Sequence, residues 1–140
     1  MKSFFESSAF IFWAFAFVLS LWAIGFWYSL PFLFWWYDVI LHFLGGVAVF
    51  LSSQLILRGL RINASGGQFF WANFALTLGI VMFVGVFWEF WEFILDRFIL
   101  HNGFTYLPGV YEDTLSDLFY DFAGGSIGFM IYNKIYGLPR

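Results

Sequence analysis

Four long apolar stretches, separated by short connections, constrain this chain more than any other feature of its sequence. They cover about residues 9–28, 32–57, 69–95 and 115–136. Each is close to or longer than the roughly 20 residues that an α-helix needs to cross the bilayer core. The chain is 62% apolar and only 11% charged, so it has too little polar surface to cover a soluble globule. We therefore expect an all-α fold, with one transmembrane domain over residues 1–140 that forms a polytopic four-helix bundle.

The basic residues indicate how the four predicted helices are oriented. An even number of spans puts both termini on one side of the membrane, together with the connection between the second and third helices. Five of the six basic residues fall on that side, and only Arg97 falls on the other. The five are Lys2, Arg58, Arg61, Lys134 and Arg140. Because positively charged connections stay in the cytoplasm, we expect a bacterial inner (plasma) membrane protein with cytoplasmic N- and C-termini.

Composition excludes several classes of function. The formal net charge is -3 and no basic cluster occurs, so the sequence predicts no nucleic-acid partner. The chain has no cysteine, which excludes disulfides, thiolate nucleophiles and cysteine-ligated metals. Chemistry in this chain must therefore use carboxylates and imidazole. Membrane lipid is the expected partner, the substrate stays unknown, and assembly into a homo-oligomer stays open.

Acidic residues that are far apart in sequence meet at the predicted outer end of the bundle. They start the second helix, end the third and start the fourth, with one histidine beside them. The group comprises Asp38, His42, Glu89, Glu92, Asp96, Glu112, Asp113, Asp117 and Asp121. Residues three or four apart share a helix face, so each of these helices carries a polar stripe. A charge that faces lipid near the bilayer centre costs at least about 2.5–3.5 kcal/mol, so we expect the stripes to face the bundle interior.

Carboxylates gathered in this way repel one another. Two of them about 4 Å apart repel by about 4 kcal/mol at an effective dielectric constant near 20, so the cluster needs a cation or shared protons. A divalent metal ion fits one imidazole with several carboxylates, with zinc, manganese or iron favoured over magnesium or calcium. The predicted metal-binding residues are Asp38, His42, Glu89, Glu92, Asp117 and Asp121. Asp38 or a glutamate is expected to orient the imidazole.

A simpler interpretation is open for the outermost acidic residues. Glu89, Glu92, Asp96, Glu112 and Asp113 are also explained as solvated charges at the membrane interface. In the same interpretation, Thr114 and Asp117 form a capping box at the N-terminus of the fourth helix.

The connection between the third and fourth helices is too apolar for a free loop. We expect residues 97–111 to lie on the membrane surface and to cover the pocket as a lid, with bends at Gly103 and Pro108-Gly109. Arg97 is a candidate to neutralise one carboxylate, and His101 is interpreted as an ordinary loop residue. The tryptophans near this end, among them Trp88, are assigned to an aromatic belt without chemistry.

The second and fourth helices resemble each other. Residues 38–50 align with residues 117–129 at five identities in thirteen positions, which pairs His42 with Asp121. Either the chain consists of two repeated helical hairpins, or the match arose by chance in a sequence of biased composition. The glycine pairs Gly45-Gly46 and Gly124-Gly125 predict that these two helices approach closely.

Three motifs carry a family resemblance. They are Asp38-x-x-x-His42-Phe43, Trp88-Glu89-x-x-Glu92 and Asp113-Thr114-x-x-Asp117-x-x-x-Asp121. Over about residues 38–128 the sequence resembles the YjdF-like inner-membrane proteins, a bacterial family of uncharacterised function, and more distantly the VanZ-like proteins. VanZ-like proteins usually have lysine in place of Val39 and amides in place of Glu92 and Asp121. Their association with tolerance of glycopeptide antibiotics implies an envelope role, and the resemblance implies a shared polar site without a reaction.

The sequence therefore predicts a small integral membrane protein whose outward-facing pocket binds a divalent metal ion. If the protein is an enzyme, the metal activates water or a phosphate-bearing lipid or envelope substrate, with Glu89 or Glu92 as general base. The alternatives are a cation- or proton-coupled transport unit and a non-catalytic scaffold subunit. Transport needs a polar route toward the cytoplasm, and beyond Gly46 and Gly125 the helices offer only scattered serine, threonine, asparagine and glutamine side chains.

Overall fold

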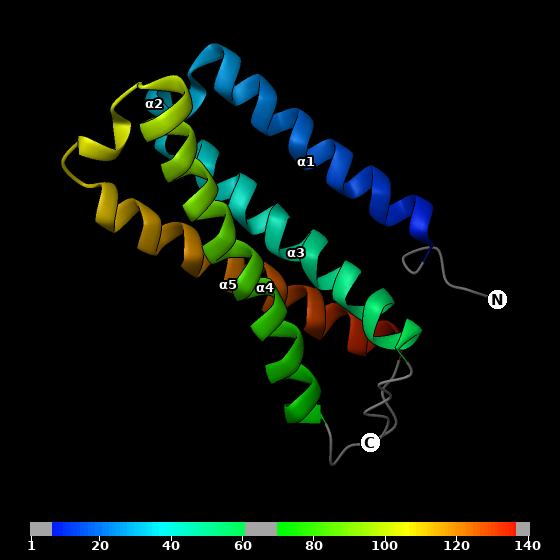
Figure 1. The fold of residues 1–140 in the computed structure, drawn as a ribbon. Coiled ribbons are helices and arrows are strands. Elements are labelled where there is room, and N and C mark those ends of the chain that lie inside the picture. The colour runs from blue at the N-terminus through cyan, green and yellow to red at the C-terminus, as the bar shows by residue number, and fades with distance from the viewer. Residues whose placement is uncertain (1–6, 61–69, 137–140) are drawn as a thin grey trace.

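The computed structural model describes residues 7–60 and 70–136, and their side chains except at positions 32, 58, 59 and 136. The elements in chain order are α1 (Ser8–Tyr28), α2 (Leu30–Leu33), α3 (Trp35–Gly59), α4 (Phe70–Ile94), a π-helix (Leu95–Leu100), a 3-10 helix (Phe104–Tyr106) and α5 (Val110–Tyr136). The four long helices pack together, and the described residues contain no strand (Figure 1). The predicted all-α four-helix bundle is therefore confirmed. Whether it arose from two repeated hairpins stays a prediction.

Three of the described helices are long and apolar enough to cross a membrane. They are Ser8–Tyr28, Trp35–Leu57 and Phe70–Leu100, the last of which joins α4 to the π-helix. The fourth predicted span, α5, is long enough with its 27 residues, but it is not among the helices whose hydropathy and low charge fit a membrane span. Its four acidic residues lower its hydropathy, and two of them, Asp117 and Asp121, lie buried. Contacts of α5 with α3 and α4 therefore enclose these two carboxylates, whereas Glu112 and Asp113 at its start are exposed.

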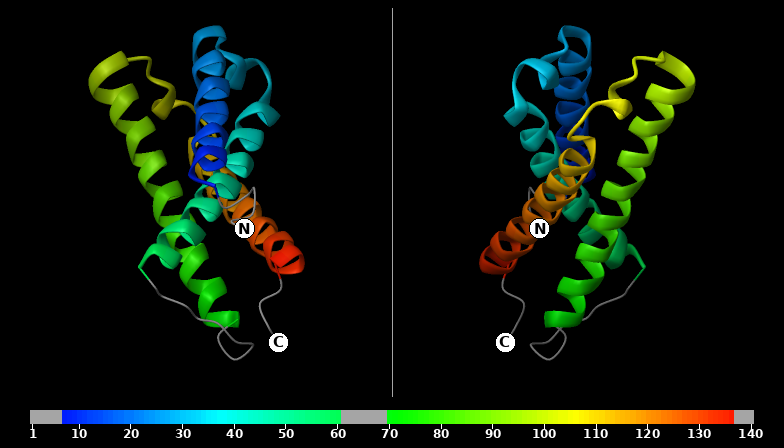
Figure 2. Two further views of the ribbon diagram at one scale, coloured as in Figure 1. Left: turned by 90° about the vertical axis from the view of Figure 1, so that its right-hand side faces the viewer. Right: turned by 90° about the vertical axis from the view of Figure 1, so that its left-hand side faces the viewer.

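The helix ends that carry the acidic residues lie together. In Figures 1 and 2 the end of α1, α2, the start of α3, the end of α4 and the start of α5 gather at one end of the bundle, which we call the site end. The described starts of α1 and α4 and the ends of α3 and α5 point the opposite way. Because α3 packs against α1, α4 and α5, it holds the bundle together.

Two helix boundaries differ from the expected ones. The predicted helix over residues 32–57 is interrupted, because Phe34 is extended (φ -136°) and separates α2 from α3. The last helix begins at Val110, five residues before the predicted Leu115. Thr114 therefore lies inside α5, and the alternative in which it caps this helix is wrong.

Glycines bring α3 and α5 into backbone contact. A Cβ atom on Gly46 would overlap the backbone carbonyl of Asp121, and one on Gly124 would overlap the carbonyl of Phe43. Only glycine lets the two helices approach this closely. The predicted close packing of these two helices is therefore confirmed.

The hydrophobic core lies beyond these glycines, on the side away from the site end. It consists of Val49, Phe50, Val81, Phe129 and Tyr132. Phe50 and Phe129 are 0% and 1% exposed, and their rings meet edge to face at 6.0 Å. The core therefore fills the middle of the bundle between the acidic cluster and the opposite end.

The predicted orientation of the chain depends on residues that are mostly outside the described part. Lys2, Arg61 and Arg140 lie outside it, and the side chain of Arg58 is not described. Lys134 is exposed near the end of α5, opposite the site end. The cytoplasmic position of the termini therefore stays a prediction.

Candidate metal centre

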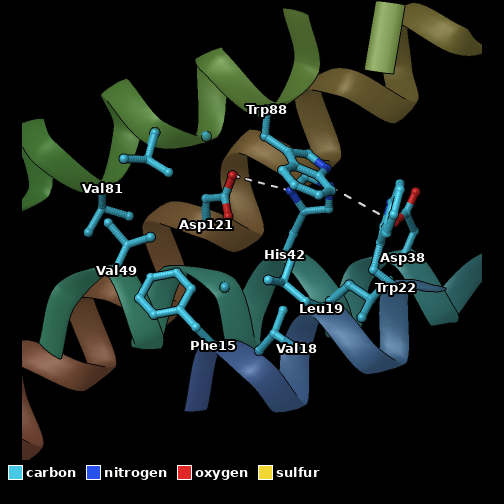
Figure 3. Close-up of a pocket in the computed structure, with 14 residues that line it drawn as sticks. Phe15, Val18, Leu19, Trp22, Asp38, His42, Val49, Val81, Trp88 and Asp121 are labelled. Carbon is cyan, nitrogen blue, oxygen red and sulfur yellow. Dashed lines mark hydrogen bonds and ion pairs between the residues drawn. The ribbon is translucent and has the colours of Figure 1, made fainter. Parts of the chain in front are cut away.

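His42 lies at the centre of the acidic cluster. It occupies the second turn of α3 and is 5% exposed. Its Nδ1 lies 3.2 Å from Asp121 Oδ2, and its Nε2 lies 3.9 Å from Asp38 Oδ1 and 3.7 Å from Glu89 Oε1. Figure 3 shows the imidazole between the Asp121 and Asp38 carboxylates. The two ring nitrogens therefore face different partners.

Two overlapping groups of side chains could hold a metal ion. Asp38, His42 and Asp117 form one, and His42, Glu89 and Glu92 form the other, with the donor atoms of each group within 4.8 Å of one another. Tetrahedral ligands at about 2.0 Å from a metal lie about 3.3 Å apart, so small side-chain movements would suffice to close either group. The fold thus brings together five of the predicted ligands from α3, α4 and α5.

Two atoms at the centre of these groups have no hydrogen-bond partner among the described residues. They are the buried His42 Nε2 and Glu89 Oε1. A buried polar atom left unpaired costs about 1–3 kcal/mol, so such atoms in native proteins call for a bound ion, a water or a proton. Nε2 is also the ring nitrogen that faces Asp38 and Glu89, which makes it the candidate metal ligand on the imidazole.

The sixth predicted ligand, Asp121, has a different position. Its carboxylate lies at His42 Nδ1, and it belongs to neither metal-binding group. A carboxylate at the second nitrogen fixes the orientation and tautomer of a metal-binding imidazole. The geometry gives this orienting place to Asp121, whereas the sequence suggested Asp38 or a glutamate.

Gly85 on α4 makes room for this arrangement, and the sequence analysis missed it. A Cβ atom there would overlap the carboxylate of Asp121. A signal was present in the sequence, because Gly85 lies four residues before Glu89 and seven before Glu92, on the same helix face. A mid-helix glycine on a polar face indicates that a neighbouring group approaches closely.

A further side chain contacts one of the glutamates of α4. Trp88 Nε1 donates a hydrogen bond of 3.0 Å to Glu92 Oε1. Trp88 was expected to have no role beyond the aromatic belt. Its spacing of four residues from Glu92 was the available signal.

The cluster carries a strong excess of negative charge. In the described part of the chain, His42 is the only basic group within ion-pair distance of these carboxylates. Arg97, expected to neutralise one of them, instead donates from Nε to Thr105 Oγ1 at 2.7 Å, and its guanidinium lies 3.4 Å from the centre of the Tyr106 ring. Repulsion within the cluster is therefore left for a cation or for protons to relieve.

Comparison with known proteins places the chain in a family. A family model described as "Predicted membrane protein (DUF2238)" matches residues 3–136. The chain belongs to the DUF2238 family. Comparisons with curated proteins and with solved structures gave no match. With its apolar helices, this DUF2238 chain is an integral membrane protein with transmembrane helices.

Asp96 in this DUF2238 protein is separate from the metal-binding groups and is not a solvated charge. It is 1% exposed and accepts hydrogen bonds from the backbone N–H groups of Gly103, Phe104 and Thr105. The Thr105 hydroxyl donates to the same carboxylate. Asp96 therefore fastens the predicted lid segment to the π-helix and is a structural residue.

Loss of this anchor is expected to loosen the segment. In Asp96→Asn, one acceptor oxygen becomes an amide N–H₂ group that faces N–H or O–H donors. We expect limited proteolysis to cleave residues 101–109 at least several-fold faster than in the wild type. Glu112→Gln, which neutralises an exposed carboxylate nearby, is the matched control and should be cleaved at the wild-type rate. Equal cleavage of all three proteins would contradict the anchoring role.

His101 lies at the bend that follows the π-helix. It is exposed and has a φ of 56°, in the left-handed region. Gly103 and Gly109 also have positive φ values, of 78° and 93°, so the backbone at both predicted bends takes a conformation that glycine adopts readily. His101 belongs to neither metal-binding group, and its interpretation as an ordinary loop residue stays a prediction.

Proposed function

We propose that this membrane protein binds a divalent transition-metal ion between α3, α4 and α5. The unpartnered, buried His42 Nε2, which faces Asp38 and Glu89, is the observation that carries the proposal. One imidazole among carboxylates suits zinc, manganese or iron better than magnesium or calcium, which prefer oxygen ligands alone. The acidic residues and the ion would then neutralise each other in a place where lipid and protein exclude water.

The residues divide into ligands and one positioning residue. Asp38, His42, Glu89, Glu92 and Asp117 are the candidate ligands, and a glutamate that does not bind the metal is available as a general base. Asp121 positions the imidazole from the other ring nitrogen. If the protein is an enzyme, a bound ion would supply Lewis-acid activation of water or of a phosphate-bearing lipid or envelope substrate.

The proposal puts the site end on the outer face of a bacterial inner membrane. The excess of basic residues predicted at the opposite end supports this orientation. The resemblance to YjdF-like inner-membrane proteins supports the choice of membrane. The packed core of Phe50 and Phe129 between the cluster and the opposite end favours a site that opens on one side over a transport path through a single copy.

Elemental analysis of the purified protein tests the proposal directly. We expect about one equivalent of zinc, manganese or iron per chain in the wild type, and almost none in a variant with both Asp38→Ala and His42→Ala. Glu112→Gln removes an exposed carboxylate outside the groups and should keep the metal. Equal metal content in the double variant and the wild type would end the proposal.

A further inference from the structure

We propose that two cavities on either side of Asp38 together bind an amphiphile with an ammonium-bearing head group. Its hydrocarbon chain would occupy the cavity between α1 and α4, and its head group the cavity at the site end. The inference rests on the proposed function only in placing a metal ion where the two cavities meet. It adds the class of molecule that would reach that ion.

The chain cavity is apolar except at one end. It has a volume of about 100 Å³, and its walls include Phe15, Val18 and Leu19 of α1 and Val81 and Val84 of α4. Its polar lining residues are Asp38, His42 and Asp121, and Figure 3 shows them grouped with Trp88 at one side of the apolar ones. An apolar slot with polar groups at one end matches the shape of a hydrocarbon chain attached to a head group.

The position of α1 leaves this cavity next to the bilayer. α1 packs mainly against α3, where the Tyr37 hydroxyl donates to the Leu21 carbonyl at 2.7 Å. It meets α4 through the Trp22 and Trp88 rings, whose centres lie 5.6 Å apart near the site end. Both walls belong to candidate membrane spans, so lipid chains are the molecules that surround the cavity.

The head-group cavity has the opposite character. Its volume is about 280 Å³, and it lies among the end of α1, the start of α3, the π-helix and the start of α5. Asp38, Glu92 and Asp113 line it, and the described lining residues include no lysine or arginine. Aromatic side chains also line it, including Trp22 and Trp35. Carboxylates beside aromatic rings favour an organic cation, and they repel an anionic head group.

The two cavities share part of their lining. Trp22, Asp38 and Leu41 belong to both. A molecule that fills both must therefore pass directly beside Asp38, with His42 on the chain side and Glu92 on the head-group side. The junction between its chain and its head group would then lie against the proposed metal ligands.

Photochemical labelling tests this proposal. The probe is an alkyltrimethylammonium with a diazirine on its chain, added to the protein in nanodiscs of an uncharged diglycosyl-diacylglycerol, which has neither an ammonium group nor a net charge that would favour one probe in the bilayer. We expect labelling of α1 and α4 at the cavity walls, among them Val18 and Val84. An alkyl sulfate with the same chain should label these positions at least about tenfold less. Equal labelling by the two probes would overturn the head-group assignment.

Variants separate this proposal from the metal proposal. Asp113→Asn lies outside both metal-binding groups, so it should lower labelling about tenfold while the metal content stays unchanged. Glu112→Gln is the matched control and should be labelled as the wild type is. Val84→Trp should block the chain cavity and lower labelling even if Asp113→Asn fails to fold. Unchanged labelling in Val84→Trp would overturn the assignment of the chain cavity.

A probe without a chain distinguishes a lipid from a free amine. Tetramethylammonium should displace the photoprobe only at concentrations far above those at which unlabelled alkyltrimethylammonium does. Displacement by both at similar concentrations would show that the chain contributes nothing, and the amphiphile proposal would then fail. If the purified wild type holds no metal but is still labelled at these positions, the metal proposal fails and the amphiphile proposal stands.

Discussion

Gly124→Ala is expected to lower the thermal midpoint of unfolding by about 5–10 °C, or to prevent folding altogether. The new Cβ atom would overlap the backbone carbonyl of Phe43, and a backbone atom cannot rotate out of the way as a side chain can. Overpacking of this kind costs about 1–3 kcal/mol or more, and each kcal/mol lowers the midpoint by about 4 °C in a chain of this size. Circular dichroism during heating in detergent measures the effect. The same reasoning applies to Gly46→Ala, which would meet the carbonyl of Asp121.

Gly79→Ala is the matched control for this prediction. Gly79 is exposed within α4, and no described residue comes within 4 Å of where its Cβ atom would lie. Alanine is the better helix former by up to about 1 kcal/mol, so this variant should melt at or slightly above the wild-type temperature. If Gly124→Ala melts at the same temperature as Gly79→Ala, the close packing of α3 on α5 does not stabilise the bundle as described.

Zinc is expected to raise the thermal midpoint of metal-depleted protein by about 10 °C at a free concentration of about 100 Kd. Binding to the folded state alone contributes about 2.7 kcal/mol at that concentration, which the same conversion turns into a midpoint shift. Removal of His42, the residue common to both metal-binding groups, should abolish the shift. A thermal-shift titration with zinc and manganese in parallel measures it.

Two variants sharpen this test. Asp121→Asn keeps all the proposed ligands and weakens only the group that orients the imidazole, so it should lower zinc affinity by about 10–100-fold without abolishing binding. Glu112→Gln should behave as the wild type does, since its carboxylate is exposed and outside the groups. If zinc raises the midpoint of His42→Ala as much as that of the wild type, the ion binds elsewhere.

Local sequence features predicted much of the architecture. Apolar length predicted the long helices, because a bilayer fixes how many residues a span needs. The order of the helices then predicted that Asp38, His42, Glu89, Glu92 and Asp117 meet at one end, because successive helices of a bundle run in opposite directions. Glycine pairs predicted the contact of α3 with α5, because few other residues permit it.

Three features could not be predicted in this way, because each depends on contacts between elements. Asp96 was grouped with the cluster, but the following chain folds back and supplies N–H donors for it from Gly103 to Thr105. Arg97 lies next to it in sequence and instead bonds to Thr105. The connection also decides where α5 starts, because its 3-10 helix and the turn at Gly109 directly precede Val110, the first residue of α5.

The sequence alone determined which residues reach the site end, and the tertiary structure alone decided what each of them does there. Helical spacing places Asp121 and Asp117 on one face, but it does not say which neighbour each carboxylate meets. The rotation of each helix about its axis is set by packing. Gly46 and Gly85 leave the room that lets Asp121 reach His42 Nδ1, so that Nε2 turns toward Asp38 and Glu89. That rotation depends on the shapes of three helices at once, and no single stretch of sequence contains it.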